Sequence, residues 1–181
     1  MRVYYDAGVF IDYLSMRGNR ILRTEVRRGR VPAGMAADAE RLFDVVRRAH
    51  VGATSCLTYY EAEEALYKQL AQSAKGVARA NTLIIPAARA ITAQVQIVVD
   101  LFKISVLDLS SATIRAQLEN PELRMRGVRA ADALHAATAI TFDADLIVST
   151  DKGLLQLDSL LTNARGGKIL CRDTDVALQL M

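Results

Sequence analysis

The chain has 181 residues, 51% of them hydrophobic, and a formal net charge of +3. This length predicts a single domain, residues 1–181, with enough apolar content for a hydrophobic core. No low-complexity tract or internal repeat is present, which excludes a largely disordered or repeat protein. Cys56 and Cys171 lie far apart in apolar runs and are expected to be buried free thiols. No secretory signal is recognisable, and polar residues interrupt the apolar stretch 83–102, so we expect a cytoplasmic protein without a membrane span.

The positive charge is concentrated in the first 50 residues. They carry ten Arg and six acidic residues, a net charge of +4, whereas the remainder carries −1. Six arginines lie in one short segment: Arg17, Arg20, Arg23, Arg27, Arg28 and Arg30. Because the guanidinium fork binds phosphate in bidentate fashion, this Arg-rich segment, residues 17–34, suits an RNA or DNA partner. A solvated surface is an equally common use of such a cluster, and we expect the segment to protrude or to be mobile.

Strands and helices alternate along the chain. Val3–Tyr5 is β-branched and aromatic, which predicts a strand, and the apolar residues from Val9 onward return at helical spacing. Further strands are predicted at 51–56, 104–109, 144–150 and 168–171, and helices at 36–49, from 57 to about 72, from 83 or 86 to 102, from 110 to 118 and at 129–141. This alternation predicts an α/β fold of three layers, with a parallel sheet of about five strands and a helical insertion between strands 2 and 3.

Local motifs predict where several helices begin. Thr58 and Glu61 match a capping box, which predicts Thr58 as the N-cap of its helix. Pro86 is expected in the first turn of the following helix. Ser110 or Ser111 is expected to cap the next helix, and Asn120-Pro121 to form a turn.

Four acidic residues are predicted near the carboxyl edge of the sheet. Asp6 ends the first strand and Asp151 ends the fourth, whereas Glu61 and Asp132 each lie in the first turn of a helix. Ligands of open α/β sheets bind at this edge. Taken alone, Asp6 is equally well explained as a helix cap, and Asp132 as an exposed first-turn acid.

Taken together, the four carboxylates point to a cation. Without one they would repel each other and their pKa values would rise. Oxygen ligands favour Mg²⁺ or Mn²⁺, and no matching cluster of His and Cys suggests zinc. Asp132 lies among the six alanines of residues 129–139, where burial of a charge is costly unless a helix N-terminus and a metal compensate it. His135, one turn later, could donate to a carboxylate or phosphate, although a packed structural role is the simpler expectation.

Four segments, in this order, resemble the motifs of PIN-domain nucleases. They are Asp-Ala-Gly-Val-Phe-Ile (6–11), Thr-Ser-Cys-Leu-Thr-Tyr-Tyr-Glu (54–61), Ala-Asp-Ala-Leu-His-Ala-Ala-Thr-Ala (131–139) and Leu-Ile-Val-Ser-Thr-Asp-Lys-Gly-Leu (146–154). The resemblance covers most of the chain and is greatest to the VapC-type toxins of toxin–antitoxin pairs. Each motif alone is weak, but four in sequence on the expected elements form a specific pattern.

The resemblance implies a PIN-like fold and a metal-dependent endoribonuclease. Asp6, Glu61, Asp132 and Asp151 would be both the catalytic residues and the ligands of Mg²⁺ or Mn²⁺, and Ser149 would support the site by hydrogen bonding. The metal would activate a water that attacks an RNA phosphodiester. As in type II toxin–antitoxin pairs, the expected partners are RNA, a cognate antitoxin protein and a second copy of the chain in a homodimer.

The sequence also departs from the family pattern. Position 8 is Gly, where a Ser or another small polar residue is more usual, and residues 17–34 and 72–95 look like expansions. Glu64, one helical turn after Glu61, could replace it as ligand. Four further acids are not expected to be ligands: Asp12, Asp108, Asp143 and Asp145.

Two other functions are compatible with the sequence. A catalytically silent RNA-binding or scaffolding module would keep the same fold, but four repelling carboxylates have little purpose without a metal. A phosphatase or receiver-type domain would need a second acid next to Asp6, which the sequence lacks.

Overall fold

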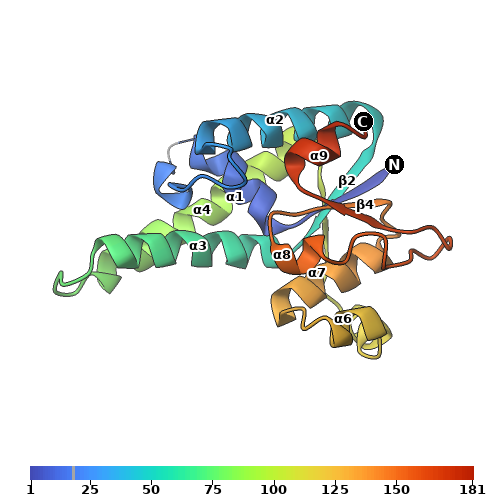
Figure 1. Cartoon of the computed structure of the whole chain (residues 1–181). Helices are drawn as coiled ribbons and strands as arrows, with labels where there is room; N and C mark the ends of the chain where they lie inside the picture. The colour runs from blue at the N-terminus through green and yellow to red at the C-terminus, as the bar shows by residue number, and fades with distance from the viewer. Residues whose placement is uncertain (18) are drawn as a thin grey trace.

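The computed structural model describes residues 1–17 and 19–181 and has an α/β architecture (Figure 1). Its sheet has five parallel strands among these residues, in the order β3-β2-β1-β4-β5. The strands are β1 (Arg2–Tyr5), β2 (Val51–Ser55), β3 (Ser105–Leu107), β4 (Leu146–Val148) and β5 (Leu170–Arg172). The predicted fold class is therefore confirmed, and β1 lies at the centre of the sheet.

Helices cover both faces of the sheet (Figure 1). One face carries α1 (Ala7–Ser15), α2 (Pro32–Ala49), α3 (Leu57–Ser73), α4 (Asn81–Phe102) and α9 (Thr174–Leu178). The other carries α6 (Pro121–Met125), α7 (Ala130–Thr141) and α8 (Lys152–Leu155), with α5 (Ser111–Gln117) against α7. Side chains of β1 alternate between these layers: Val3 and Tyr5 enter the first core and Tyr4 enters the second.

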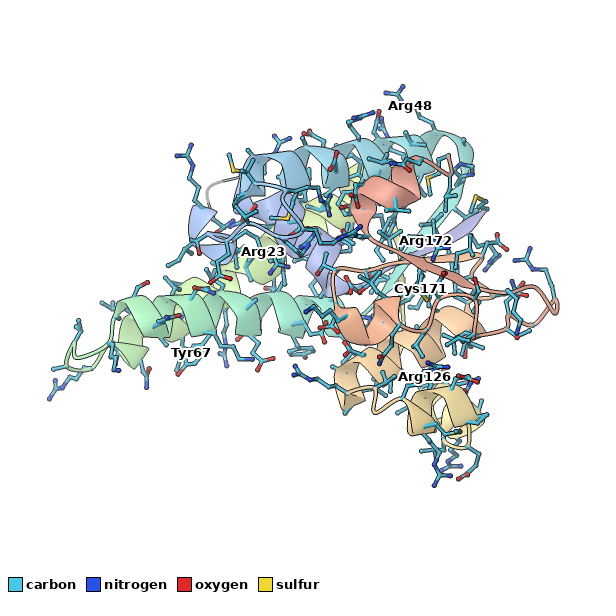
Figure 2. All side chains as sticks on the ribbon, in the orientation of Figure 1. Arg23, Arg48, Tyr67, Arg126, Cys171 and Arg172 are labelled. Atoms are coloured by element: carbon cyan, nitrogen blue, oxygen red, sulfur yellow. The ribbon has the colours of Figure 1, made fainter. Side chains whose placement is uncertain are left out.

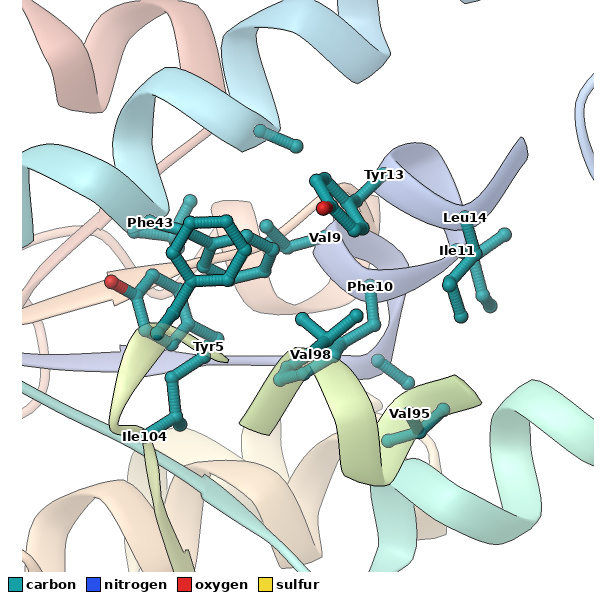
Figure 3. Packing of buried hydrophobic residues seen from close by; sticks show 14 of the residues in the cluster. Tyr5, Val9, Phe10, Ile11, Tyr13, Leu14, Phe43, Val95, Val98 and Ile104 are labelled. Atoms are coloured by element: carbon teal, nitrogen blue, oxygen red, sulfur yellow. The ribbon is translucent and has the colours of Figure 1, made fainter. Parts of the chain in front are cut away.

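An aromatic cluster fills the first core (Figure 3). The rings of Tyr5 and Phe43 meet edge to face with centroids 5.0 Å apart, and Phe10 lies 5.2 Å from Phe43. Tyr13 and Phe102 extend the cluster through a further edge contact at 5.6 Å. These rings join β1, α1, α2 and α4, and so fix the position of the loop that follows β1.

The predicted helical insertion between strands 2 and 3 consists of α3 and α4, which extend side by side away from the sheet (Figure 1). Pro86 is inside α4, not in its first turn, because the helix begins at Asn81, before both predicted starts, residues 83 and 86. α4 has the length and apolar composition of a membrane span, but its Ile91, Val95 and Val98 are buried in the core.

Several element boundaries differ from the sequence-based expectation. β3 and β4 each have three residues, because the sheet pairs only the middle of the predicted runs. The helix after β2 begins at Leu57, so Thr58 is not its N-cap. The Thr58 hydroxyl is instead 2.7 Å from that of buried Thr54, which ties the first turn of α3 to β2. Ser110, by contrast, caps α5 by accepting from the Thr113 N–H at 3.1 Å.

The described part of the Arg-rich segment, residues 17 and 19–34, is held against the core and does not protrude freely. It includes the short 3₁₀ helix η1 (Arg20–Leu22), whose Leu22 is buried, and a β-bridge between Arg27 and Arg30. Its other anchors are two fully buried carboxylates, Asp12 on α1 and Asp173 before α9. The sequence hides this pairing because one acid is distant along the chain and the other looks like an ordinary helix residue.

These two carboxylates bind several arginines at once. Asp12 accepts from Arg23 Nε and Arg27 Nη2, each at 2.7 Å. Asp173 forms an ion pair with Arg30 Nη2 at 2.7 Å and accepts hydrogen bonds from Arg27 and Arg28 at 3.2 Å. The arginine charges lower the pKa of Asp173, although burial alone would raise it. Much of the basic cluster predicted as a phosphate-binding surface is therefore engaged within the protein.

Candidate active site

All four predicted acids line one cavity of about 470 Å³ at the carboxyl edge of the sheet. Asp6 immediately follows central strand β1, and Asp151 follows β4 at the start of α8. Glu61 comes from the first turns of α3 and Asp132 from the first turn of α7. The parallel sheet produces this convergence because the chain leaves β1, β2 and β4 in the same direction.

Ser149 connects the first and the last of these acids. Its buried hydroxyl donates to Asp6 Oδ2 and accepts from the backbone N–H of Asp151 at 2.9 Å. The backbone N–H of Asp6 in turn donates to Val148 O at 3.1 Å. One side chain thus fixes the orientation of Asp6 and the position of Asp151, as expected for a supporting residue.

Gly153 lies close to the carboxylates of both Asp132 and Asp151, and there is no room for a side chain at this position. Asp151 Oδ1 accepts from the Gly153 N–H at 2.5 Å, which caps α8. A Cβ atom on Gly153 would lie 2.8 Å from Asp132 Oδ2 and 3.0 Å from Asp151 Oδ1. Glycine is therefore required here by the close approach of two carboxylates, a role that the sequence analysis missed.

Glu61 is oriented by a chain of hydrogen bonds from the second core. Its Oε2 lies 2.7 Å from Nε2 of His135, which is 1% exposed. The other ring nitrogen, Nδ1, is 2.8 Å from the hydroxyl of buried Tyr4. His135 therefore does more than pack on α7: it fixes Glu61 through one nitrogen and contacts the central strand through the other.

Glu64 is a weaker candidate for the second motif. It also lines the cavity, but its carboxylate is paired with Lys68 at 2.6 Å and more than half of its side chain is exposed. Asp143 and Asp145 lie at the opposite edge of the sheet, where both pair with Arg165 at 2.6 Å. Asp12, which was also not expected to be a metal ligand, is fully buried and pairs with Arg23.

Asp6 and Asp132, two of the acids that line the cavity, have raised pKa values. Burial raises the pKa of Asp6 to about 6, although the nearby His135 acts in the opposite direction. Burial, followed by the charges of the neighbouring acids, raises the pKa of Asp132 to about 6. Burial alone would lower the pKa of His135, but its hydrogen bond to Glu61 and the surrounding negative charge raise it overall.

The donor set fits a hard divalent cation. Asp6 Oδ1 and Asp132 Oδ2 are both buried and have no hydrogen-bond partner among the described residues. Buried carboxylate oxygens without partners are costly, and a cation would satisfy both oxygens and remove the repulsion. Within residues 1–17 and 19–181, no three His, Cys, Asp or Glu side chains are already gathered closely enough to hold a metal ion. Binding of a cation would therefore require the carboxylates to move closer to one another.

Comparison with models of known protein families and with curated protein sequences finds no match to this chain. The function is accordingly inferred from the site itself and from the four sequence motifs.

Proposed function

We propose that this protein is an Mg²⁺- or Mn²⁺-dependent endoribonuclease that cleaves RNA phosphodiester bonds with an activated water. The observation that carries the proposal is the pair of unpartnered buried oxygens, Asp6 Oδ1 and Asp132 Oδ2, in a cavity lined by four acids. Arg23 and Arg27 line the same cavity, which makes it compatible with a phosphate-bearing substrate.

Asp6, Asp132 and Asp151 are the residues that would hold the metal, with Glu61 completing the set. When bound, the metal supplies an activated water and stabilises the negative charge that develops on the phosphate. Ser149 keeps Asp6 in place by donating to Oδ2, while Oδ1 has no hydrogen-bond partner among the described residues and could coordinate the metal. His135 keeps Glu61 in place in the same way through Nε2.

We further infer a place in the PIN-domain family, among the VapC-type toxins of toxin–antitoxin pairs. Support comes from the four motifs around Asp6, Glu61, Asp132 and Asp151, together with the parallel sheet that brings them to one cavity. The proposal includes a cytoplasmic location, a cognate antitoxin and a homodimer. Coexpression of the chain with the product of a short neighbouring reading frame tests the toxin assignment, since an antitoxin should restore growth that the chain alone arrests.

Metal binding and cleavage together test the enzymatic proposal. Millimolar Mn²⁺ should raise the midpoint of thermal unfolding of the wild type, because a ligand that binds only the folded state stabilises it. Asp132→Asn should lose both this shift and RNA cleavage. Asp108→Asn, which changes an exposed acid away from the cavity, should retain both. A wild type that is not stabilised by Mn²⁺ and does not cut RNA would instead be a silent RNA-binding or scaffolding module.

A further inference from the structure

Arg23 is placed to bind a ligand in the cavity of the four acids. Its side chain, labelled in Figure 2, is 30% exposed, and its Nε donates to the fully buried Asp12 at 2.7 Å. A guanidinium has five N–H donors. Among the contacts of the described residues, the terminal nitrogens of Arg23 make only a long contact, from Nη2 to Thr150 Oγ1 at 3.5 Å. Arg23 lines the cavity of the four acids, and most of its donors have no partner among the described residues.

Arg27 is less available for this task, although it lines the same cavity. Its Nη1 and Nη2 both donate to Asp12, and Nη2 also reaches Asp173 at 3.2 Å. Its terminal nitrogens are thus occupied in fastening the Arg-rich segment. Asp12 thus pairs with both arginines. None of the four acids forms an ion pair with an arginine in the described part of the chain.

Thr150 occupies the space that a side chain at position 8 would need. A Cβ atom on Gly8 would lie 2.0 Å from Thr150 Oγ1 and 3.0 Å from Asp6 Oδ1. The hydroxyl expected at position 8 in the resembled family is therefore supplied from the β4 side of the cavity. Because Thr150 Oγ1 faces the Arg23 guanidinium as an acceptor, its own proton is directed to another acceptor.

We propose that Arg23 and Thr150 form a subsite that binds a backbone phosphate of RNA beside the four acids. The guanidinium contributes charge and forked donors, and the hydroxyl contributes a further donor from the side of Asp151. The subsite gives part of the Arg-rich segment a direct role in substrate binding, while Asp12 acts through Arg23 as a positioning residue. This inference rests on the proposed ribonuclease function because it takes RNA as the ligand.

RNA binding without metal tests the subsite separately from catalysis. The probe is a fluorescently labelled, unstructured single-stranded RNA oligonucleotide, titrated with the full chain in EDTA at several salt concentrations. Arg23→Gln should weaken binding about tenfold or more, as expected for a lost charge-assisted hydrogen bond. It should also reduce the slope of log K against log salt by about 0.7, the change for one single-strand phosphate contact.

Two further variants control the measurement. Arg20→Gln removes an exposed arginine of the same segment that lines a different cavity, and should bind RNA like the wild type. Thr150→Val removes only the hydroxyl and leaves the Arg23–Asp12 pair intact, so it should weaken binding even if Arg23→Gln fails to fold. Equal salt slopes in the Arg23, Arg20 and wild-type proteins, or unchanged binding by the Thr150 variant, would overturn the subsite. Failure of the ribonuclease proposal is recognised separately, by a wild type that lacks cleavage and Mn²⁺ stabilisation.

Discussion

Nε2 of His135 lies 2.7 Å from Oε2 of Glu61, and this contact orients the one acid of the site that projects from the α3–α4 insertion. Groups that orient metal ligands typically contribute 10–100-fold to metal affinity or activity. His135→Ala should therefore weaken Mn²⁺ binding and slow RNA cleavage by about 10–100-fold. Isothermal titration with Mn²⁺ and cleavage of a labelled RNA measure the two effects. Tyr4→Phe keeps the contact to Glu61 and should retain most of the activity; an equal loss in both variants would point to a packing defect.

Ser149 should matter to the site more than its size suggests. Ser149→Ala removes the donor to Asp6 Oδ2 and the acceptor for the Asp151 N–H. Leaving a buried polar group without its partner typically costs about 1–3 kcal/mol, and more for a charged group, so both cleavage and the free energy of unfolding should fall. Chemical denaturation and cleavage rates check this expectation. Ser73→Ala, in an exposed turn at the end of α3, is the control and should change neither.

Without metal, the protein should become less stable as the pH rises from about 4 to about 6. The pKa of Asp6 is raised from 3.8 to about 6, so the folded state binds more protons than the unfolded chain in this range. Above pH 6 the ionised, buried Asp6 alone costs about 3 kcal/mol. The raised pKa of His135 does not contribute in this range: its stabilising charge is fully present below its ordinary pKa of 6.5, and it is lost only as the pH rises above that value.

Thermal unfolding measured across this pH range tests the electrostatic account. Asp6→Asn should flatten the profile, because the amide does not ionise. Saturating Mn²⁺ should also flatten the pH profile of the wild type, because it stabilises the folded protein at higher pH, where the carboxylates are ionised. A wild-type profile that stays level between pH 4 and pH 6 in EDTA would contradict the raised pKa values.

A methyl group at Gly153 should disable the site while leaving the fold intact. In Gly153→Ala the new Cβ would lie 2.8 Å from Asp132 Oδ2, in the space between Asp132 and Asp151. We expect loss of Mn²⁺ stabilisation and at least a tenfold slower cleavage, in the range typical of disturbed metal ligands. Gly34→Ala on α2 is the matched control, since its Cβ meets no atom closer than 4.0 Å. That variant should keep full activity and gain up to about 1 kcal/mol of stability.

The anchoring of the Arg-rich segment makes a different prediction. Asp12→Asn removes a fully buried charge that pairs with Arg23 and Arg27. We expect a loss of about 2–3 kcal/mol, less than for a completely buried pair because both guanidinium groups are partly exposed. Asp44→Asn breaks surface pairs with Arg47 and Arg48 on α2 and should cost less than about 1 kcal/mol. Urea denaturation of the two variants compares them directly.

The sequence predicts the elements of the site better than the contacts between them. Asp6 and Asp151 can be placed because each follows an apolar strand, and parallel strands bring their carboxyl ends together. The pairing of Asp12 with Arg23 is hidden, since an isolated Asp inside an apolar helix carries no signal of its partner. The position of the Thr150 hydroxyl next to Gly8 could not be predicted for a similar reason, because it depends on the pairing of β1 with β4.

The starts of α3 and α4 also depend on tertiary contacts that the local sequence does not predict. Thr58 and Glu61 match a capping pattern, but the tertiary contact of Thr58 with Thr54 takes precedence over the local motif. Proline is tolerated in the first turn of a helix, which predicts Pro86 near the start of α4. The helix instead begins more than one turn before Pro86, at Asn81, where α4 packs against α3. For α3 and α4, tertiary contacts thus override the local start signals, whereas α5 begins at the cap that the sequence predicts, Ser110.

The alternation of side chains along β1 ties the chemistry to a single strand register. Tyr5 fills the aromatic core on one side, while the Tyr4 hydroxyl reaches His135 on the other. A slip of one residue would turn each of these side chains to the opposite face of the sheet, where it would still meet an apolar core. It would nevertheless break the contact with His135 and move Asp6 away from Ser149. Activity should thus distinguish a correctly paired sheet from a compact misfolded one that retains normal secondary structure.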